Sequence, residues 1–284
     1  MSGTLYVVAT PIGNLNDISK RAIDVLSEVD LIACEDTRQS IKLLNHYEIK
    51  NKLISYHKFN EKTKSLSIVD DLLNGKNVAL VSDAGTPCIS DPGYNLVKEA
   101  RENGIDVIGI PGCSATVTAL SVSGLAVTNF SFLGFLSNDT SKFNEEMDLI
   151  HNSSINTFII YESPKRLVKL VTRLNEEFKD SKIYIASDLT KIHERGFFGK
   201  TSEVLEVIKN DPNIEKGEYV VILEKKEESK KIDDEISLEA LLVDTMIKND
   251  ITLKDAIKYL NDNNKDIKKN DLYKASLNIK ELLK

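Results

Sequence analysis

Three segments rich in glycine, proline and small polar residues could bind a ligand through their backbones. They are residues 10–15 (TPIGNL), 82–93 (SDAGTPCISDPG) and 110–115 (IPGCSA). Glycine and proline permit tight turns and close approach, so backbone N–H and C=O groups can contact a ligand directly. The longest segment also carries two carboxylates, Asp83 and Asp91. Because every α/β domain needs tight turns, the same residues are also compatible with a purely structural role.

The chain lacks the sequence patterns that bind phosphate groups. It contains no G-x-x-x-x-G-K-[ST], and no G-x-G-x-x-G follows its first apolar run. The carboxylates of Asp83 and Asp91 would repel a phosphate and instead suit an ammonium group, a sulfonium group or ribose hydroxyls. S-adenosylmethionine has all three and no phosphate, so the sequence favours it as the ligand.

Carboxylates elsewhere in the chain are candidate bases for a hydroxyl acceptor. A hydroxyl is a weak nucleophile, and a positioned base that accepts its proton accelerates transfer. The candidates are Glu35, Asp36 and Glu162, with Glu194 as a further one. The alternative is that each carboxylate forms a structural ion pair, for example Glu162 with Arg166 or Asp36 with Arg38.

The arginine and histidine side chains indicate substrate contacts rather than metal binding. Arg38 and Arg166 could bind phosphates of a nucleic acid, because a guanidinium group stays charged and meets phosphate oxygens in pairs. His193, in the segment HERGFFG, is a candidate for packing a loop or contacting substrate. The other histidines have no metal-ligand spacing with one another or with cysteine, so we predict no metal site.

The composition is that of a globular protein, with 284 residues of which 41% are hydrophobic and 29% are charged. A disordered chain would have too few apolar residues to offset its entropy. The three cysteines form no C-x-x-C pair, which disfavours a disulfide framework or a zinc site. No apolar run reaches the roughly 18 residues of a membrane span, and the N-terminal residues do not resemble a signal peptide. We therefore expect a cytoplasmic protein with no membrane partner.

The charge of the chain is unevenly distributed. The net charge of −7 argues against indiscriminate binding of polyanions. Residues 38–64, however, hold seven Lys/Arg and two Glu, with Tyr47, Tyr56 and Phe59 among them. Residues 251–284 hold eight Lys and five acidic residues. These two basic segments are either ordinary solvated faces or contacts for RNA.

Short β-branched runs alternate with helical patterns over the first part of the chain. The pattern predicts strands at residues 4–9, 30–34, 52–56, 77–81 and 106–110, and helices at 18–29, 63–74, 91–103 and 114–123. Asp17 is the predicted N-cap of the first helix, and Asp91 caps the third with Pro92 in its first turn. The alternation predicts a mostly parallel sheet with helices on both faces, whose three Gly/Pro segments lie at the carboxyl ends of strands.

The alternation resumes in the second part of the chain. It predicts strands at residues 130–135, 157–161, 182–186 and 218–224, helices at 163–178 and from 201, and a loop over HERGFFG. Three helical patterns follow a charged run, at residues 238–247, 253–260 and 271–283. We therefore expect an α/β protein with domains at 1–117 and 118–226, a linker at 227–236 and a helical module at 237–284.

The segments ATPIGNL, EDTR, VSDAGTPCISDPG, PGCSA and YESPKR resemble the tetrapyrrole methylase superfamily over residues 3–225, most closely its group that methylates small-subunit ribosomal RNA. The resemblance implies two α/β domains with S-adenosylmethionine in the cleft between them, and a homodimer. It also implies that the acceptor is the 2′-hydroxyl of a cytidine in 16S ribosomal RNA, free or in the assembled small subunit.

The resemblance also assigns residues to the site. Those that would bind the cofactor are Pro11, Gly13, Asp83, Ala84, Gly85, Thr86, Ile89, Ser90, Pro111, Gly112, Ser114 and Ala115. EDTR matches a segment on the acceptor side and YESPKR an element facing the cleft, so Arg38, Lys165 and Arg166 would bind substrate.

Two other classes of function remain open. A methyltransferase for a small tetrapyrrole would have no need of the two basic segments. A non-catalytic RNA-binding protein on the same scaffold would not bind S-adenosylmethionine.

Overall fold

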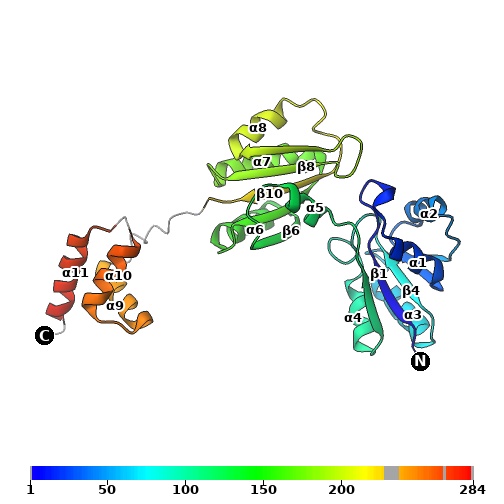
Figure 1. Ribbon diagram of the computed structural model, residues 1–284, viewed down its shortest axis with the longest axis horizontal. Helices are drawn as coiled ribbons and strands as arrows, with labels where there is room; N and C mark the ends of the chain where they lie inside the picture. Colours follow the sequence, from blue (N-terminus) through cyan, green and yellow to red (C-terminus); the bar gives the residue numbers. More distant parts are fainter. Residues whose placement is uncertain (1, 227–236, 265–266, 283–284) are drawn as a thin grey trace. The chain divides into compact units, whose positions relative to one another are not determined.

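The computed structural model describes residues 2–226, 237–264 and 267–282, which belong to two compact units that divide after Lys226 (Figure 1). The predicted linker at residues 227–236 lies outside the described residues.

The first unit begins with a five-stranded parallel sheet in the order β3-β2-β4-β1-β5. Its strands are β1 (Thr4–Val8), β2 (Leu31–Cys34), β3 (Leu53–Ser55), β4 (Val78–Val81) and β5 (Asp106–Ile110). The connections contain η1 (Leu15–Asp17), α1 (Lys20–Glu28), α2 (Thr37–His46), α3 (Glu61–Leu73) and α4 (Tyr94–Glu102). The parallel sheet predicted from the alternation is confirmed.

Helices cover both faces of this sheet because successive strand side chains point to opposite sides. On one face, Leu5 and Leu80 pack in a core with side chains of α3 and α4 such as Leu72 and Leu96. On the other face, the core joins Val8 to side chains of α1 and α2. Strands buried on both faces explain the continuous apolar runs in the sequence.

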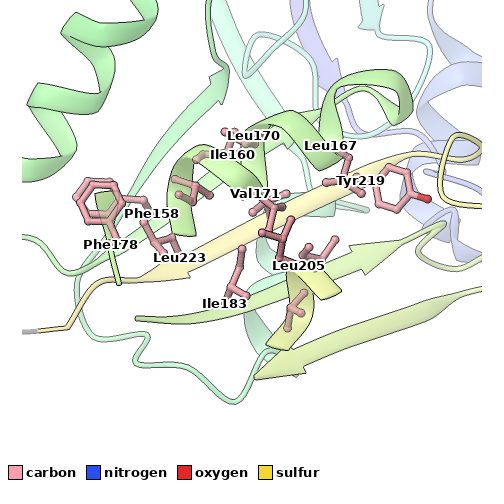
Figure 2. Close-up of a cluster of buried hydrophobic side chains, with 14 of the residues drawn as sticks. Phe158, Ile160, Leu167, Leu170, Val171, Phe178, Ile183, Leu205, Tyr219 and Leu223 are labelled. Carbon is pink, nitrogen blue, oxygen red and sulfur yellow. The ribbon is translucent and has the colours of Figure 1, made fainter. Parts of the chain in front are cut away.

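A second five-stranded sheet, in the order β6-β7-β10-β8-β9, completes the first unit. Its strands are β6 (Phe130–Phe135), β7 (Thr157–Glu162), β8 (Lys182–Ser187), β9 (Arg195–Lys200) and β10 (Tyr219–Glu224). Only β6 and β7 pair in parallel, and the other three pairings are antiparallel. One face packs against α6 (Thr140–Asn152), α7 (Pro164–Glu177) and α8 (Thr201–Lys209), with Phe158, Leu170 and Leu223 in the shared core (Figure 2).

The helix α5 (Ala115–Val122) connects the two sheets. It follows β5 of the first sheet and is N-capped by Ser114, yet its Ala119 and Leu120 pack against Ile159 and Ile222 of the second sheet. The predicted division at residue 117 would fall inside this helix, and that division stays a prediction.

Two predicted helix starts were wrong. Helix α1 begins at Lys20 and is capped by Ser19, whose hydroxyl accepts from the Ala22 N–H at 3.1 Å, so Asp17 is not the cap. Helix α4 begins at Tyr94, after Gly93 with its φ of 145°. Neither Asp91 nor Pro92 belongs to it.

A carboxylate from another helix takes the place of the expected cap of α4. Glu61 of α3 accepts from the backbone N–H groups of Gly93 and Asn95 at 3.0 and 3.3 Å. These groups would otherwise lack partners at the start of the helix. Asp91 therefore remains in the loop at the end of the first sheet.

Besides the short η1, the sequence analysis missed three elements. Helices α2 and α6 were not predicted, and Arg195–Lys200 forms β9 rather than the loop expected for HERGFFG. A Cβ at Gly196 would lie 2.7 Å from the hydroxyl oxygen of Tyr184 on the neighbouring strand, so the Tyr184 ring would have to move to admit a side chain there.

The second unit contains three helices, α9 (Leu238–Asn249), α10 (Leu253–Asn263) and α11 (Lys269–Leu282). Leu242, Leu260 and Leu272 belong to their common core, which confirms the predicted helical module. Within the described ranges, no helix of the protein has the length and apolar character needed to cross a membrane.

Candidate functional site

The three Gly/Pro segments meet because β4, β1 and β5 are neighbours in the first sheet. Thr10 and Gly85 form an isolated bridge, in which the N–H of each donates to the carbonyl oxygen of the other at 2.9 and 3.0 Å. The Thr86 hydroxyl donates to the Cys113 carbonyl oxygen at 3.1 Å. The segments are therefore held together as one surface at the carboxyl edge of the sheet.

A cavity of about 410 Å³ lies between this edge and the second sheet. The first sheet contributes Ile12, residues 83–86 and 89–91, Ser114 and Ala115. The second sheet and its loops contribute Phe135, residues 161–164, Leu189 and residues 217–220. The volume is in the range of small-molecule sites, which commonly combine apolar walls with a few polar groups.

The predicted cofactor residues divide into two groups. Those that line the cavity are Asp83, Ala84, Gly85, Thr86, Ile89, Ser90, Ser114 and Ala115. Those that do not line it are Pro11, Gly13, Pro111 and Gly112. Binding of a cofactor by the first group stays a prediction.

Gly13 and Gly112 position the cavity walls by permitting close approach. A Cβ on Gly112 would lie 2.9 Å from the Cβ of Ala9, so the loops after β1 and β5 could not pack as they do. A Cβ on Gly13 would lie 2.9 Å from the Leu189 carbonyl oxygen. Since Leu189 lines the cavity from the second sheet, Gly13 sets the approach of the two halves.

The lining of the cavity is acidic at Asp83 and Asp91. Glu162 and Glu218 line it as well, and none of the described lining residues is lysine, arginine or histidine. Basic side chains outside the lining balance these last two, Arg166 at 3.4 Å from Glu162 and Lys191 at 3.0 Å from Glu218. Burial and the neighbouring Asp83 charge raise the pKa of Asp91. Burial and the charges of Asp91 and Asp83 likewise raise the pKa of Glu35, which does not line the cavity. Such a field favours a positively charged ligand.

Glu162 is the candidate base that combines burial with access to the cavity. Only 3% of the residue is exposed, and its Oε1 accepts from the Ser163 N–H at 2.7 Å. Its Oε2 has no hydrogen-bond partner within the described structure, although the Arg166 guanidinium lies 3.4 Å away. The Arg166 guanidinium therefore balances the charge of this buried oxygen.

Asp36 and Arg38 form a pair with each other outside the cavity. The Arg38 guanidinium donates to both carboxylate oxygens of Asp36, whose side chain also caps α2. These bonds lower the pKa of Asp36 to about 2, so it is a poor base near neutral pH. Arg38 itself is largely exposed and remains accessible to a phosphate.

The two basic residues of the YESPKR motif have different surroundings. Arg166 donates to the Leu136 carbonyl oxygen at 2.9 Å and pairs with the Asn138 side chain, in addition to Glu162. These bonds hold the segment after β6 and leave Arg166 less free for substrate. Lys165 is exposed and does not line the cavity.

Sequence reasoning missed the aromatic wall of the cavity. Tyr161 donates or accepts a hydrogen bond of 2.7 Å with the Thr116 hydroxyl, and the rings of Phe132 and Phe135 pack edge-to-face against it. Phe132 and Phe135 reach the same ring because β6 has a bulge between Phe132 and Gly134, where φ is 67°. The glycine within an aromatic run was the available signal.

Of the remaining candidates, Glu194 accepts from the Thr190 N–H at 2.7 Å and shapes the loop after β8. His193 lies in that loop. In the described part of the chain, no three His, Cys, Asp or Glu residues are arranged to hold a metal ion.

Two sheets with their helices, and a cavity between the sheets, make up the fold of a methylase. The sequence profile of the tetrapyrrole (corrin/porphyrin) methylases matches residues 4–205, and the chain belongs to this family. Among solved structures, uroporphyrin-III C-methyltransferase from Thermus thermophilus complexed with S-adenosylhomocysteine is similar with a TM-score of 0.54, at 17% identity, over 78% of this chain and 97% of that one.

Closer relatives have one name in common. The chain is 41% identical to ribosomal RNA small subunit methyltransferase I of Haemophilus influenzae over 90% of each chain. It is 40% identical to the protein of that name from Buchnera aphidicola subsp. Schizaphis graminum, over 99% of this chain and 98% of the relative.

Proposed function

We propose that this protein is a cytoplasmic methyltransferase that uses S-adenosylmethionine to methylate the 2′-hydroxyl of a cytidine ribose in 16S, small-subunit ribosomal RNA. The observation that carries the proposal is a cavity lined by Asp83 and Asp91, which form no ion pair within the described residues, in a chain of the methylase family. The relatives that cover nearly the whole chain carry the name of the RNA methyltransferase.

The lining residues fit the proposed methyl donor. S-adenosylmethionine supplies a methyl group attached to a positively charged sulfur. Asp83 and Asp91 would bind its amino group or ribose hydroxyls, while Ile12, Leu189 and Val220 offer apolar surface to its base. The acidic field around Asp91 disfavours a phosphate-bearing cofactor in the same cavity.

Glu162 would accept the proton of the acceptor hydroxyl. Glu162 lines the cavity, and its hydrogen bond with the Ser163 N–H and its ion pair with Arg166 fix the orientation of the carboxylate. We place Asp83 at the amino or ribose end of the donor, away from the reacting sulfur. Sulfur loses its positive charge during transfer, and a carboxylate in contact with it would oppose that change.

The assembly proposed for the protein is a homodimer that binds RNA at its basic segments. A symmetric pair could place the basic segment of one chain beside the cavity of its partner. Light scattering should then give a mass twice the 31.7 kDa of one chain.

Mass spectrometry of RNA tests the function directly. We would incubate full-length protein, S-adenosylmethionine and small ribosomal subunits or bare RNA from a strain lacking the enzyme, and then map methyl groups by nuclease digestion. One 2′-O-methylcytidine is expected with the natural chain, and little with Glu162→Gln. No methyl transfer to either RNA substrate by the natural chain would contradict the proposal.

A further inference from the structure

The turn between β3 and α3 exposes an aromatic side chain almost completely. Phe59 is 95% exposed, whereas the other aromatic residues of the basic segment are engaged. Tyr56 is buried and bonded to Glu61 and Ser65, and the Tyr47 hydroxyl donates to the Leu15 carbonyl oxygen. Phe59 is thus the one of these three rings that is open to a partner.

This turn holds Phe59 in a defined position. The Asn60 side chain accepts from the His57 N–H at 2.9 Å and donates to the Ser55 carbonyl oxygen at 3.1 Å. The Asn60 N–H closes the turn on the His57 carbonyl oxygen at 3.0 Å. Such preorganisation lowers the entropy cost of binding, because the backbone that carries the ring is already fixed.

The surface around Phe59 is positively charged. Lys58 and Lys62 are exposed. The acidic residue between them, Glu61, is turned inward, where it caps α4 and accepts from Tyr56. The exposed face of the turn is therefore basic, although the whole chain has a net charge of −7. This combination of a bare ring and cations suits single-stranded nucleic acid better than an apolar protein surface.

A hydrogen bond connects the turn to the loop that lines the cavity. Glu61, two residues after Phe59, accepts from the Gly93 N–H at 3.0 Å. Gly93 closely follows residues 89–91, which line the cavity. Phe59 therefore belongs to a turn bound to the cavity loop, outside the lining itself.

We propose that Phe59 is a stacking platform for a base of single-stranded RNA next to the acceptor nucleotide, with Lys58 and Lys62 contacting the adjoining phosphates. This proposal rests on the proposed RNA methyltransferase function. Stacking on an aromatic ring accepts any base, so Phe59 would contribute affinity and register without selecting sequence.

Full-length variants test the platform. The probe is a fluorescent oligocytidylate of about 12 nucleotides, titrated at several salt concentrations. Phe59→Ala and Phe59→Leu should each weaken binding about tenfold with an unchanged salt slope, and Phe59→Trp should restore it. Lys58→Ala should make the salt slope shallower. Leu149→Ala, which trims another exposed apolar side chain, is the matched control.

Two further measurements separate this proposal from the proposed function. S-adenosylmethionine affinity, measured by calorimetry, should be equal in all variants, and methyl transfer by Phe59→Ala should show a raised KM for RNA. If the natural chain is active and Phe59→Ala has the same RNA affinity and the same KM for RNA, the stacking platform is overturned and the proposed function is not. A dimer that dissociates in Phe59→Ala without loss of RNA affinity would overturn it as well. A natural chain that neither binds nor methylates RNA would overturn both proposals.

Discussion

Asp83 combines a structural bond with a place in the cavity wall. Its Oδ1 accepts from the Asp36 N–H at 3.0 Å, and the residue lines the cavity. We expect Asp83→Ala to weaken S-adenosylmethionine binding by about 1–3 kcal/mol, because polar partners lose their acceptor. Calorimetry measures this change.

The variant Asp83→Asn separates the two roles of this residue. It keeps an acceptor for the Asp36 N–H but removes the charge. If it binds the donor as weakly as Asp83→Ala, the charge is what matters. Unchanged affinity in both variants would refute the assignment of Asp83 to the donor.

Asp91 is expected to lower the stability of the protein at neutral pH. Burial and the Asp83 charge raise its pKa above the ordinary 3.8, so the folded state disfavours the ionised form. The penalty is fully present above the raised pKa and disappears as pH falls below 3.8. Asp91→Asn should therefore raise the melting temperature at pH 7 and leave it unchanged at pH 3.5.

Melting curves of the natural chain and Asp91→Asn across this pH range test the prediction. A stability gain of equal size at both ends would mean that repacking, rather than charge, is responsible. The same variant should bind S-adenosylmethionine more weakly at pH 7, since it removes part of the negative field. Such opposite effects on stability and binding are common at functional sites.

The residues of the site could be predicted only where a motif marked them. Asp83 and Ser90 were recognised in the SDAGTPCISDPG segment and do line the cavity. Glu218 and Leu189 were not, because they lie in loops without distinctive composition and reach the cavity only through the folding of the second sheet. No spacing in one sequence reveals such a long-range approach.

At the scale of the elements, the loops after β1 and β8 can pack closely only because Gly13 has no side chain. Gly13 lies where a Cβ would be 2.9 Å from the backbone oxygen of Leu189. We expect Gly13→Ala to lower the free energy of unfolding by about 1–3 kcal/mol, because the loops must separate to admit the methyl group. Urea denaturation measures this loss, and donor affinity should fall with it.

Gly109→Ala on β5 is the matched control, since a Cβ there meets nothing within 4 Å. Its stability should stay within about 0.5 kcal/mol of that of the natural chain. Equal losses in both variants would show that the effect belongs to glycine in general and not to this contact.

Elements were predictable where composition and periodicity agreed. The apolar runs that form β1 and β4 were predicted as buried strands, and these two strands lie side by side in the first sheet. By contrast, Gly196 and Gly199 made β9 look like a loop, because the reason for Gly196 is the Tyr184 side chain on a neighbouring strand. The start of α4 was misplaced for a similar reason, since its cap comes from Glu61 of another helix.

At the scale of the whole molecule, the second unit has its own core and should be separable from the first. The core around Leu242, Leu260 and Leu272 contains no residue of the first unit. Removing residues 232–284 is expected to leave S-adenosylmethionine affinity intact and to weaken RNA binding. The salt dependence should become shallower, because fewer lysines displace counterions from phosphates.

Titrations of RNA into the full-length and truncated chains at several salt concentrations measure this effect. Equal slopes would exclude an RNA role for the helical module. A lower melting temperature or a weaker dimer, with the slope unchanged, would instead show that these helices stabilise the body of the enzyme or its partner subunit.

The strand order of the second sheet has a consequence for synthesis of the chain. The strand β10, last of its sheet in sequence, lies between β7 and β8 and pairs with both. Until β10 has left the ribosome, the pairs β6-β7 and β8-β9 each carry an open inner edge with apolar side chains. Such edges bind other strands readily. Released chains truncated before Tyr219 are therefore expected to bind chaperones, whereas released chains that extend past Glu224 should not.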